Sequence, residues 1–148
     1  MTRSTRSHDT MLKFGYPKSL VRDYGCWVVL ARPKQATLGA LVLACKEEVQ
    51  AFAEISGEAF AELGHVIGDI ETGLGRFSNY DKINYLMLMM VDREVHFHVL
   101  PRYAASREFR GETFEDPGWP AVPDLGAGPT LDDDALAGLV QELKTAWP

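Results

Sequence analysis

The sequence predicts an α+β domain in which antiparallel strands carry a long helix on one face. Three observations predict this class: two pairs of short β-rich runs, an apolar stripe at helical spacing between the pairs, and a second amphipathic run near the C-terminus. The chain has 148 residues, which is the usual size of one domain. We therefore expect residues 1–148 to form a single domain around one core.

Composition and charge narrow the class of protein. With 46% hydrophobic and 24% charged residues the composition is that of a globular chain, and the longest apolar run, residues 83–91, is far shorter than the roughly 18 residues of a membrane span. Residues 1–9 are basic and Ser-rich and lack the apolar stretch of a secretory signal, which leaves a disordered terminus or a transit peptide as alternatives. We expect a cytoplasmic protein without membrane partners.

The formal net charge of −6 argues against broad nucleic-acid binding, because affinity for phosphate backbones comes from clustered Lys and Arg that release counterions. A small phosphate ligand would therefore depend on local donors. No nucleic-acid partner is expected.

The first pair of β-rich runs, residues 26–32 and 38–45, is joined by residues 33–37 and predicts a hairpin. This pairing would place Cys26 nearly opposite Cys45. These are the only two cysteines, and their spacing is not that of a zinc knuckle or a disulfide scaffold. Two reduced, buried thiols are the favoured interpretation, and a disulfide across the strands is the alternative.

A helix is predicted to begin near Glu47 and to end near Gly73 or Gly75, with a break near residues 56–57 because each internal glycine costs about 1 kcal/mol relative to Ala. His65 is expected at the surface or the edge of the core. The apolar positions recur at spacings of three, four or seven, as on one face of a helix: Val49, Phe52, Ala53, Phe60, Leu63, Ile67, Ile70 and Leu74.

The second pair of runs covers residues 82–91 and 94–103, and residues 92–93 between them predict a tight hairpin. Residues 83–91 are apolar on both faces, which is typical of a central strand that is covered on both sides. The helix would cover one face, and a dimer partner is a natural candidate for the other.

Residues 109–124 are rich in turn formers and aromatic side chains but lack a strong period, which predicts an ordered loop. Its aromatic residues Phe109, Phe114 and Trp119 are expected to pack the loop onto the domain, and stacking on a base is the alternative. A final helix is predicted with Thr130 as N-cap and three aspartates in its first turn. Its apolar positions are Leu136, Leu139, Val140, Leu143 and Trp147.

Three ionisable residues at alternate positions, Glu94, His96 and His98, are expected on one face of the last strand. Such groups need water, a ligand, a metal or one another. An exposed strand face with two incidental histidines is the plainest alternative. A metal site is another, but ligands at alternate strand positions rarely complete a four-coordinate site without help, and no cysteines assist. No metal or other cofactor is expected.

The run Glu-Val-His-Phe-His-Val-Leu-Pro-Arg-Tyr at residues 94–103 resembles the signature of the histidine-triad (HIT) family, His-φ-His-φ-His-φ-φ, often followed by Pro-Arg. Residues 27–33 and 38–44 are similar to the family's nucleotide-binding hairpin, and the helix and the strand at 81–85 follow in the family's order. The resemblance covers roughly residues 22–103. It implies a HIT-like fold with about five antiparallel strands, a long helix packed on them and a C-terminal helix after residue 104, as in dinucleoside polyphosphate hydrolases and other nucleotidyl hydrolases.

The resemblance also implies roles for the two histidines. His96 matches the middle histidine, which attacks the α-phosphorus of a nucleotide and is later freed by water, while its other ring nitrogen bonds a backbone carbonyl at the first-histidine position. Imidazole suits this task because one nitrogen keeps a lone pair while the other donates a hydrogen bond. His98 matches the third histidine, which contacts the transferred phosphate and assists the leaving group.

The sequence departs from the family pattern at several positions. Glu94 replaces the first histidine, and Ala40 stands where many members have His. Glu94 would either favour imidazolium and make His96 a poorer nucleophile, or orient a catalytic group or water. Ala31 falls where some members have a polar ribose contact, and Met90 lies where related members often have a polar phosphate contact.

Candidate ligand contacts follow from the same resemblance and from charge. They are Arg102, Arg32, Met90, Ala31 and Trp27, and of the cations Arg102 is favoured because it belongs to the Pro-Arg pair. The expected function is a nucleotide hydrolase or nucleotidyl transferase that acts on a nucleoside polyphosphate or phosphoramidate through a covalent histidine intermediate, working as a homodimer. A non-catalytic nucleotide-binding module with a degenerate triad is the alternative.

Overall fold

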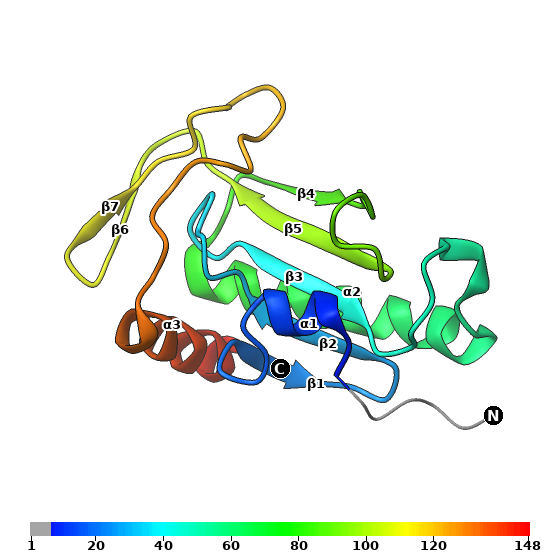
Figure 1. The fold of residues 1–148 in the computed structure, drawn as a ribbon. Helices are drawn as coiled ribbons and strands as arrows, with labels where there is room; N and C mark the ends of the chain where they lie inside the picture. The colour runs from blue at the N-terminus through cyan, green and yellow to red at the C-terminus, as the bar shows by residue number, and fades with distance from the viewer. Residues whose placement is uncertain (1–6) are drawn as a thin grey trace.

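A five-stranded antiparallel sheet in the order β1-β2-β3-β5-β4 forms the centre of the computed structural model, which describes residues 7–148 (Figure 1). The disordered terminus or transit peptide considered for residues 1–9 therefore lies mainly outside the described residues. The sheet strands are β1 (Leu20–Asp23), β2 (Trp27–Ala31), β3 (Leu41–Cys45), β4 (Lys82–Leu86) and β5 (His96–Arg102). The α+β class is confirmed. Within residues 7–148, no helix is long and apolar enough to cross a membrane.

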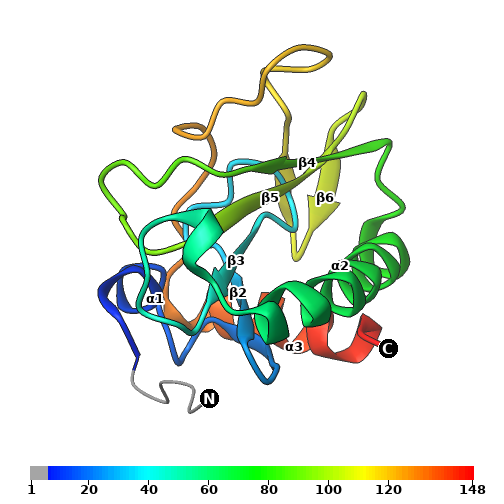
Figure 2. The same ribbon diagram turned by 90° about the vertical axis from the view of Figure 1, so that its right-hand side faces the viewer.

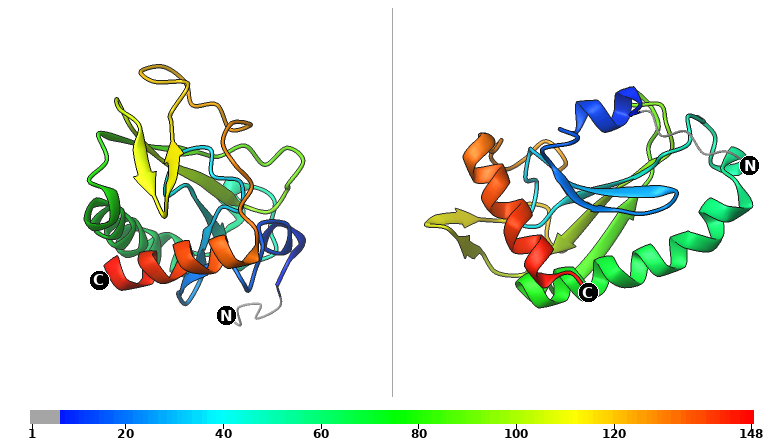
Figure 3. Two further views of the ribbon diagram at one scale, coloured as in Figure 1. Left: turned by 90° about the vertical axis from the view of Figure 1, so that its left-hand side faces the viewer. Right: turned by 90° about the horizontal axis from the view of Figure 1, so that it is seen from below.

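Helices cover both faces of the sheet. The long helix α2 (Gly57–Ser78) and the C-terminal helix α3 (Asp133–Ala146) pack on one face, and the short helix α1 (Asp9–Lys13) lies on the other (Figures 2 and 3). Strands β2 and β3 are buried at every position because they lie between these layers. The core on the α1 side consists of Met11, Phe14, Val28, Leu30, Val42 and Ala44.

The β2–β3 hairpin forms as predicted, with Trp27 opposite Cys45, so the neighbouring Cys26 lies close to the predicted partner. Cys26 and Cys45 are both buried and form no disulfide, which agrees with the reduced interpretation. The connection is longer than predicted and spans residues 32–40, because Gln35 supplies the hydrogen bonds that a tighter turn would make. Its amide donates to Arg32 O and Ala40 O at 2.7 and 2.9 Å and accepts from the Gly39 amide at 2.8 Å.

Helix α2 begins at Gly57 rather than near Glu47, which confirms the break predicted near residues 56–57. Only a short 3-10 turn, Phe52–Glu54, precedes the helix. Ser56 caps the helix by accepting from the Ala59 amide. The helix runs through Gly73 to Ser78, beyond the predicted end. Gly73 is needed for packing rather than for termination, since a Cβ there would overlap the ring of Trp147. The predicted surface histidine, His65, has a side chain that is 70% exposed.

The tight hairpin predicted at residues 92–93 is wrong. Strand β4 ends at Leu86, β5 begins at His96, and residues 87–95 form an open connection in which Met89 has a positive φ of 41°. Strand β4 also lies at the edge of the sheet rather than in its centre. The apolar run misled the prediction because its second half leaves the sheet and is exposed, as at Met90 and Val91.

The predicted ordered loop contains an additional hairpin, β6 (Arg107–Phe109) with β7 (Glu112–Phe114), which projects beyond the main sheet (Figure 1). Its turn, residues 110–111, has positive φ at both positions, the geometry of tight two-residue hairpins. Phe114 is buried and Phe109 packs edge-on against Phe77 at 5.5 Å, as expected for aromatic side chains that hold this segment to the domain. Trp119 is half-buried.

Helix α3 begins two residues later than predicted. Asp132 is the N-cap and accepts from the Ala135 amide at 2.8 Å. Thr130 pairs instead with Lys34 in an isolated β-bridge, so the C-terminal segment is tied to the β2–β3 connection.

Candidate functional site

His96 and His98 lie side by side on β5, on the face of the sheet that α1 covers. Their ring centroids are 5.2 Å apart, and their strand partners on β3 are Ala44 and Val42. Both are buried, with 1% and 5% of their surface exposed. Strand alternation therefore brings the two predicted catalytic histidines together as the sequence indicated.

The His96 ring is fixed by a hydrogen bond of 2.7 Å between Nδ1 and the backbone oxygen of Glu94. A carbonyl oxygen only accepts, so Nδ1 carries the proton and Nε2 keeps its lone pair. This is the tautomer that a nucleophilic imidazole needs. Since the acceptor belongs to the main chain, replacing the first histidine of the signature by Glu94 leaves this bond intact.

The Glu94 carboxylate forms no hydrogen bond or ion pair with His96 or His98. It accepts from the amide of Thr10 at 3.2 Å and from its hydroxyl at 2.7 Å, and it lies 3.7 Å from Nδ1 of His8. Burial alone would raise the pKa of Glu94, but the Thr10 hydrogen bonds and nearby His8 outweigh it, so the pKa lies below its ordinary value of 4.5. Glu94 therefore anchors α1 to the sheet, a role that the sequence did not indicate.

Glu94→Ala is expected to lower the free energy of unfolding by about 1–2 kcal/mol at neutral pH, because the Thr10 donors lose their partner. Because the folded pKa is lowered, the stabilisation by the carboxylate is present above its unfolded pKa and is lost as the pH falls through the folded value. Denaturant unfolding should therefore show a larger difference between wild type and variant at pH 7 than at an acidic pH below the lowered pKa of Glu94. An equal difference at both pH values would contradict this role.

The N-terminal helix forms a cover over the histidine pair. The ring of Phe14 packs edge-on against His98 at 5.4 Å and tilted against His96 at 6.0 Å. The sequence analysis missed this segment. The available signals were weak: an N-cap at His8, which accepts from the Met11 amide, and apolar residues three apart at Met11 and Phe14.

A cavity of about 320 Å³ lies beside His98, between α1 and the start of the β2–β3 connection. Burial, followed by the positive charge of Arg32, lowers the pKa of His98 to about 4. His98 is therefore neutral at pH 7 in the unliganded protein. The residues that line the cavity are Lys13, Phe14, Arg32, Pro33, Lys34, Asp92, His98 and Thr130.

Of the predicted ligand contacts, only Arg32 lines this cavity. Trp27 and Ala31 point to the opposite face of the sheet, into the core under α2 and α3, where the Trp27 indole donates to Ala59 O at 2.9 Å. Met90 is 79% exposed in the connection between β4 and β5. Strand alternation therefore turns Trp27 and Ala31 to the face opposite the histidines, and none of these three residues lines the cavity beside His98.

Arg102 is also used within the fold. Its Nε and Nη2 donate to the two carboxylate oxygens of Asp116 at 2.6 and 3.0 Å, and its Nη1 donates to Asn84 Oδ1 and Ala121 O. Both charged side chains are almost fully buried. The bidentate partner of this arginine is therefore an internal carboxylate that ties the loop after β7 to β5, rather than a ligand.

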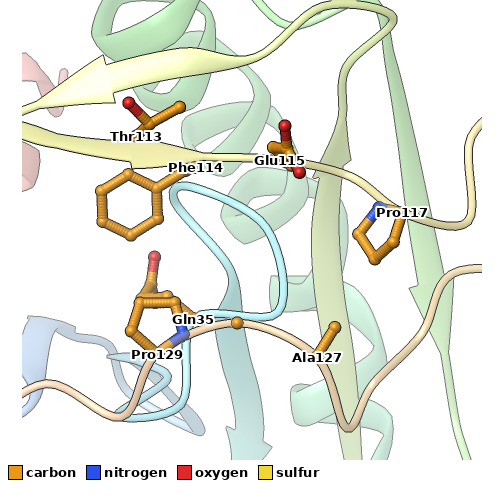
Figure 4. Close-up of a pocket in the computed structure, with 8 residues that line it drawn as sticks. Gln35, Thr113, Phe114, Glu115, Pro117, Ala127 and Pro129 are labelled. Atoms are coloured by element: carbon orange, nitrogen blue, oxygen red, sulfur yellow. The ribbon is translucent and has the colours of Figure 1, made fainter.

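A second cavity, of about 370 Å³, lies between β7, residues 127–129 and the β2–β3 connection (Figure 4). Its buried polar residue, Gln35, already bonds three backbone groups, and its one charged residue is Glu115. No histidine, cysteine or cation is among the described residues that line it. Nor do residues 7–148 contain a group of three side chains suited to hold a metal ion. The chemistry of the site therefore lies around His96 and His98.

The arrangement of the sheet and helices resembles that of histidine-triad proteins of known structure. A histidine-triad protein from Sinorhizobium meliloti superimposes with a TM-score of 0.74 at 17% identity, over 95% of this chain and 96% of the other. One from Marinobacter aquaeolei gives 0.73 at 17% identity, over 96% and 95%. A diadenosine triphosphate hydrolase from Plasmodium falciparum gives 0.63 at 9% identity, over 87% and 76%.

The chain therefore has the histidine-triad fold, as the signature at residues 94–103 implied. No protein-family model matches the sequence, and no curated protein matches it either. The function is accordingly argued from the site itself.

Proposed function

We propose that this protein is a nucleotide hydrolase or nucleotidyl transferase that attacks the α-phosphate of a nucleoside polyphosphate or phosphoramidate through His96. The observation that carries the proposal is the hydrogen bond from His96 Nδ1 to Glu94 O, which leaves Nε2 as a free nucleophile. The likeness in fold to a diadenosine triphosphate hydrolase supports the same class of substrate.

In this mechanism, Nε2 of His96 forms a bond to the α-phosphorus as the bond from phosphorus to the leaving group breaks, and the leaving group departs with the electron pair. Water then attacks the nucleotidyl-histidine, the phosphorus–nitrogen bond breaks, and His96 and the mononucleotide are released. His98 is neutral in the unliganded site, so it acts first as a hydrogen-bond partner of the phosphate. A bound anion would raise its pKa and allow it to protonate the leaving group.

Access to His96 requires a movement of its cover. Only 1% of His96 is exposed and Phe14 packs against it, so a phosphorus atom reaches Nε2 only when Phe14 moves aside. The same burial of His96 favours the second candidate, a nucleotide-binding module that has lost catalysis. In such a module Phe14 stays over His96 and keeps the phosphorus atom away from Nε2.

The two candidates are separated by incubating the purified protein with adenosine and guanosine polyphosphates and phosphoramidates. Release of mononucleotide, with a nucleotidylated histidine detected by mass spectrometry at His96, is the result expected of the enzyme. Nucleotide binding without release or adduct would identify the binding module and overturn the proposed mechanism.

We also propose that the protein is a homodimer in the cytoplasm, where its two buried thiols remain reduced. Among residues 7–148, strand β4 pairs only with β5, so its other edge is unpaired there, and the connection after it exposes Leu88, Met90 and Val91. Unpaired edges and apolar patches are commonly covered in an assembly.

A dimer joined at β4 is expected to persist at micromolar concentration. Sedimentation velocity of the full chain should then give a mass of about twice the 16.5 kDa of one chain. A single monomeric species at the same concentration would contradict the proposal.

A further inference from the structure

The N-terminal end of helix α1 is attached to the sheet by side chains. Thr10 donates to the Glu94 carboxylate from its hydroxyl at 2.7 Å and from its amide at 3.2 Å. His8 Nε2 donates to Cys45 O at 2.7 Å, and its Nδ1 accepts from the Met11 amide at 3.3 Å. Because its acceptor is a partly buried carboxylate, the hydroxyl bond of Thr10 is a charge-assisted one and among the stronger links of this helix.

The C-terminal end of α1 is held by a turn that leads into β1. Ser19 Oγ donates to Phe14 O at 2.7 Å, and the Ser19 amide donates to Gly15 O at 3.1 Å. The helix has only five residues, far fewer than the roughly 12 that a helix needs to persist alone, so contacts with the sheet decide whether it stays in place. Loss of the contacts at the N-terminal end would therefore free that end while the turn keeps the other end attached.

The apolar side chains that α1 buries are separate from the main core. Met11 and Phe14 belong to a small cluster on their own face of the sheet. The main core lies on the opposite face, under α2 and α3, and contains both thiols, Cys26 and Cys45. A segment that buries few apolar side chains opens at a lower free energy than the whole protein. The helix α1 can therefore leave the sheet without opening the main core.

We propose that α1 is a lid over the histidine pair, and that the bond from the Thr10 hydroxyl to the Glu94 carboxylate is its latch. In the closed form Phe14 packs against both histidines, and His96 is only 1% exposed. In the open form the N-terminal end of α1 lifts and the ring of Phe14 leaves the pair. A substrate binds the open form alone, so its apparent affinity falls with the fraction of molecules that are open. Only this effect on substrate rests on the proposed function.

Chemical labelling of the full chain with diethyl pyrocarbonate, which modifies accessible imidazoles, measures the opening, and mass spectrometry of peptides separates the four histidines. Thr10→Val removes the latch hydroxyl at nearly constant volume, whereas Thr10→Ser keeps it and removes the methyl group. We expect His96 to be labelled about tenfold faster in Thr10→Val than in wild type, the size of one charge-assisted hydrogen bond. In Thr10→Ser the rate should stay near that of wild type.

Two controls show that the effect belongs to the lid. His65 is exposed on α2, so its labelling rate should be the same in every variant. Thr145→Val makes the same replacement at an exposed threonine of α3, whose hydroxyl donates to Gln141 O, and should leave the labelling of His96 as in wild type.

Urea separates opening of the lid from global unfolding. Opening of α1 exposes little surface, so labelling of His96 should rise only weakly with urea below the unfolding transition. Alkylation of Cys26 and Cys45 by iodoacetamide requires the main core to open and should rise steeply. Equal urea dependence of His96 and the thiols would overturn the lid. Equal labelling of His96 in wild type and Thr10→Val, or labelling as fast in Thr10→Ser as in Thr10→Val, would overturn the latch.

These outcomes are distinguishable from failure of the proposed function. If labelling of His96 depends on the Thr10 hydroxyl but no variant releases mononucleotide from adenosine or guanosine polyphosphates, the lid stands and the catalytic mechanism is wrong. If turnover depends on His96 while Thr10→Val changes neither labelling nor kcat/KM, the enzyme stands and the latch is wrong. Faster labelling together with a higher kcat/KM in Thr10→Val supports both.

Discussion

His96→Ala is expected to abolish nucleotide turnover, with a loss of several powers of ten in kcat, because the variant lacks the atom that forms the covalent intermediate. The measurement is mononucleotide release under conditions in which wild type is active, together with mass spectrometry for the histidine adduct. Since His96 is buried against Phe14, the substitution should also cost about 1–3 kcal/mol in the free energy of unfolding, which leaves the variant folded if stability is ordinary.

His65→Ala is the matched control for this experiment. His65 is an exposed histidine of α2, 3.4 Å from Asp69, and lies outside the site, so its removal should change neither turnover nor the adduct. Activity that survives in His96→Ala, with circular dichroism showing the native fold, would refute the covalent mechanism. Activity lost equally in both variants would point to a general effect on the protein rather than to catalysis.

Asp116→Ala should be among the most destabilising single substitutions in the chain, at about 3–5 kcal/mol, because it leaves the Arg102 guanidinium buried and without its charged partner. The backbone amide of Tyr103 loses the same acceptor, at 3.2 Å. Denaturant unfolding followed by circular dichroism measures the effect.

Asp133→Ala provides the comparison, since it removes an exposed carboxylate whose pair with Lys18 is worth little in water. Its effect on the free energy of unfolding should stay within about 0.5 kcal/mol. If Asp116→Ala proved equally mild while weakening nucleotide binding, Arg102 would be a ligand contact, as its Pro-Arg context had suggested, and the structural role argued from the ion pair would be wrong.

Much of the fold could be predicted because local patterns report it. The first hairpin, the amphipathic helix and its break before Gly57, and the C-terminal helix all follow from side-chain spacing and capping preferences within a short window. The errors fall where a short window is ambiguous. Residues 83–91 have the composition of a buried strand, but half of them belong to an exposed connection, and composition alone does not say where a chain leaves a sheet.

Part of the candidate site could also be predicted from local patterns. Strand alternation placed His96 and His98 together, and a main-chain acceptor made the hydrogen bond of His96 Nδ1 independent of the side chain at position 94. The sequence could not indicate that Glu94 binds Thr10, since these residues are 84 positions apart and no local pattern connects them.

The sequence by itself thus determined the β2–β3 hairpin, the long helix, the C-terminal helix and the histidine pair, because these depend on periodicity along a few residues. Only the tertiary structure decided which side chains surround that pair. Phe14 from α1, Arg32 after β2 and Thr130 before α3 meet at one cavity, although more than a hundred residues separate the first from the last. Such encounters are set by how the layers pack and by which partners the buried charges find: Arg102 bonds the carboxylate of Asp116, whereas Arg32 bonds two neutral carbonyls. Packing is a property of the whole chain, and that is why the cavity beside His98 became visible only in the folded protein.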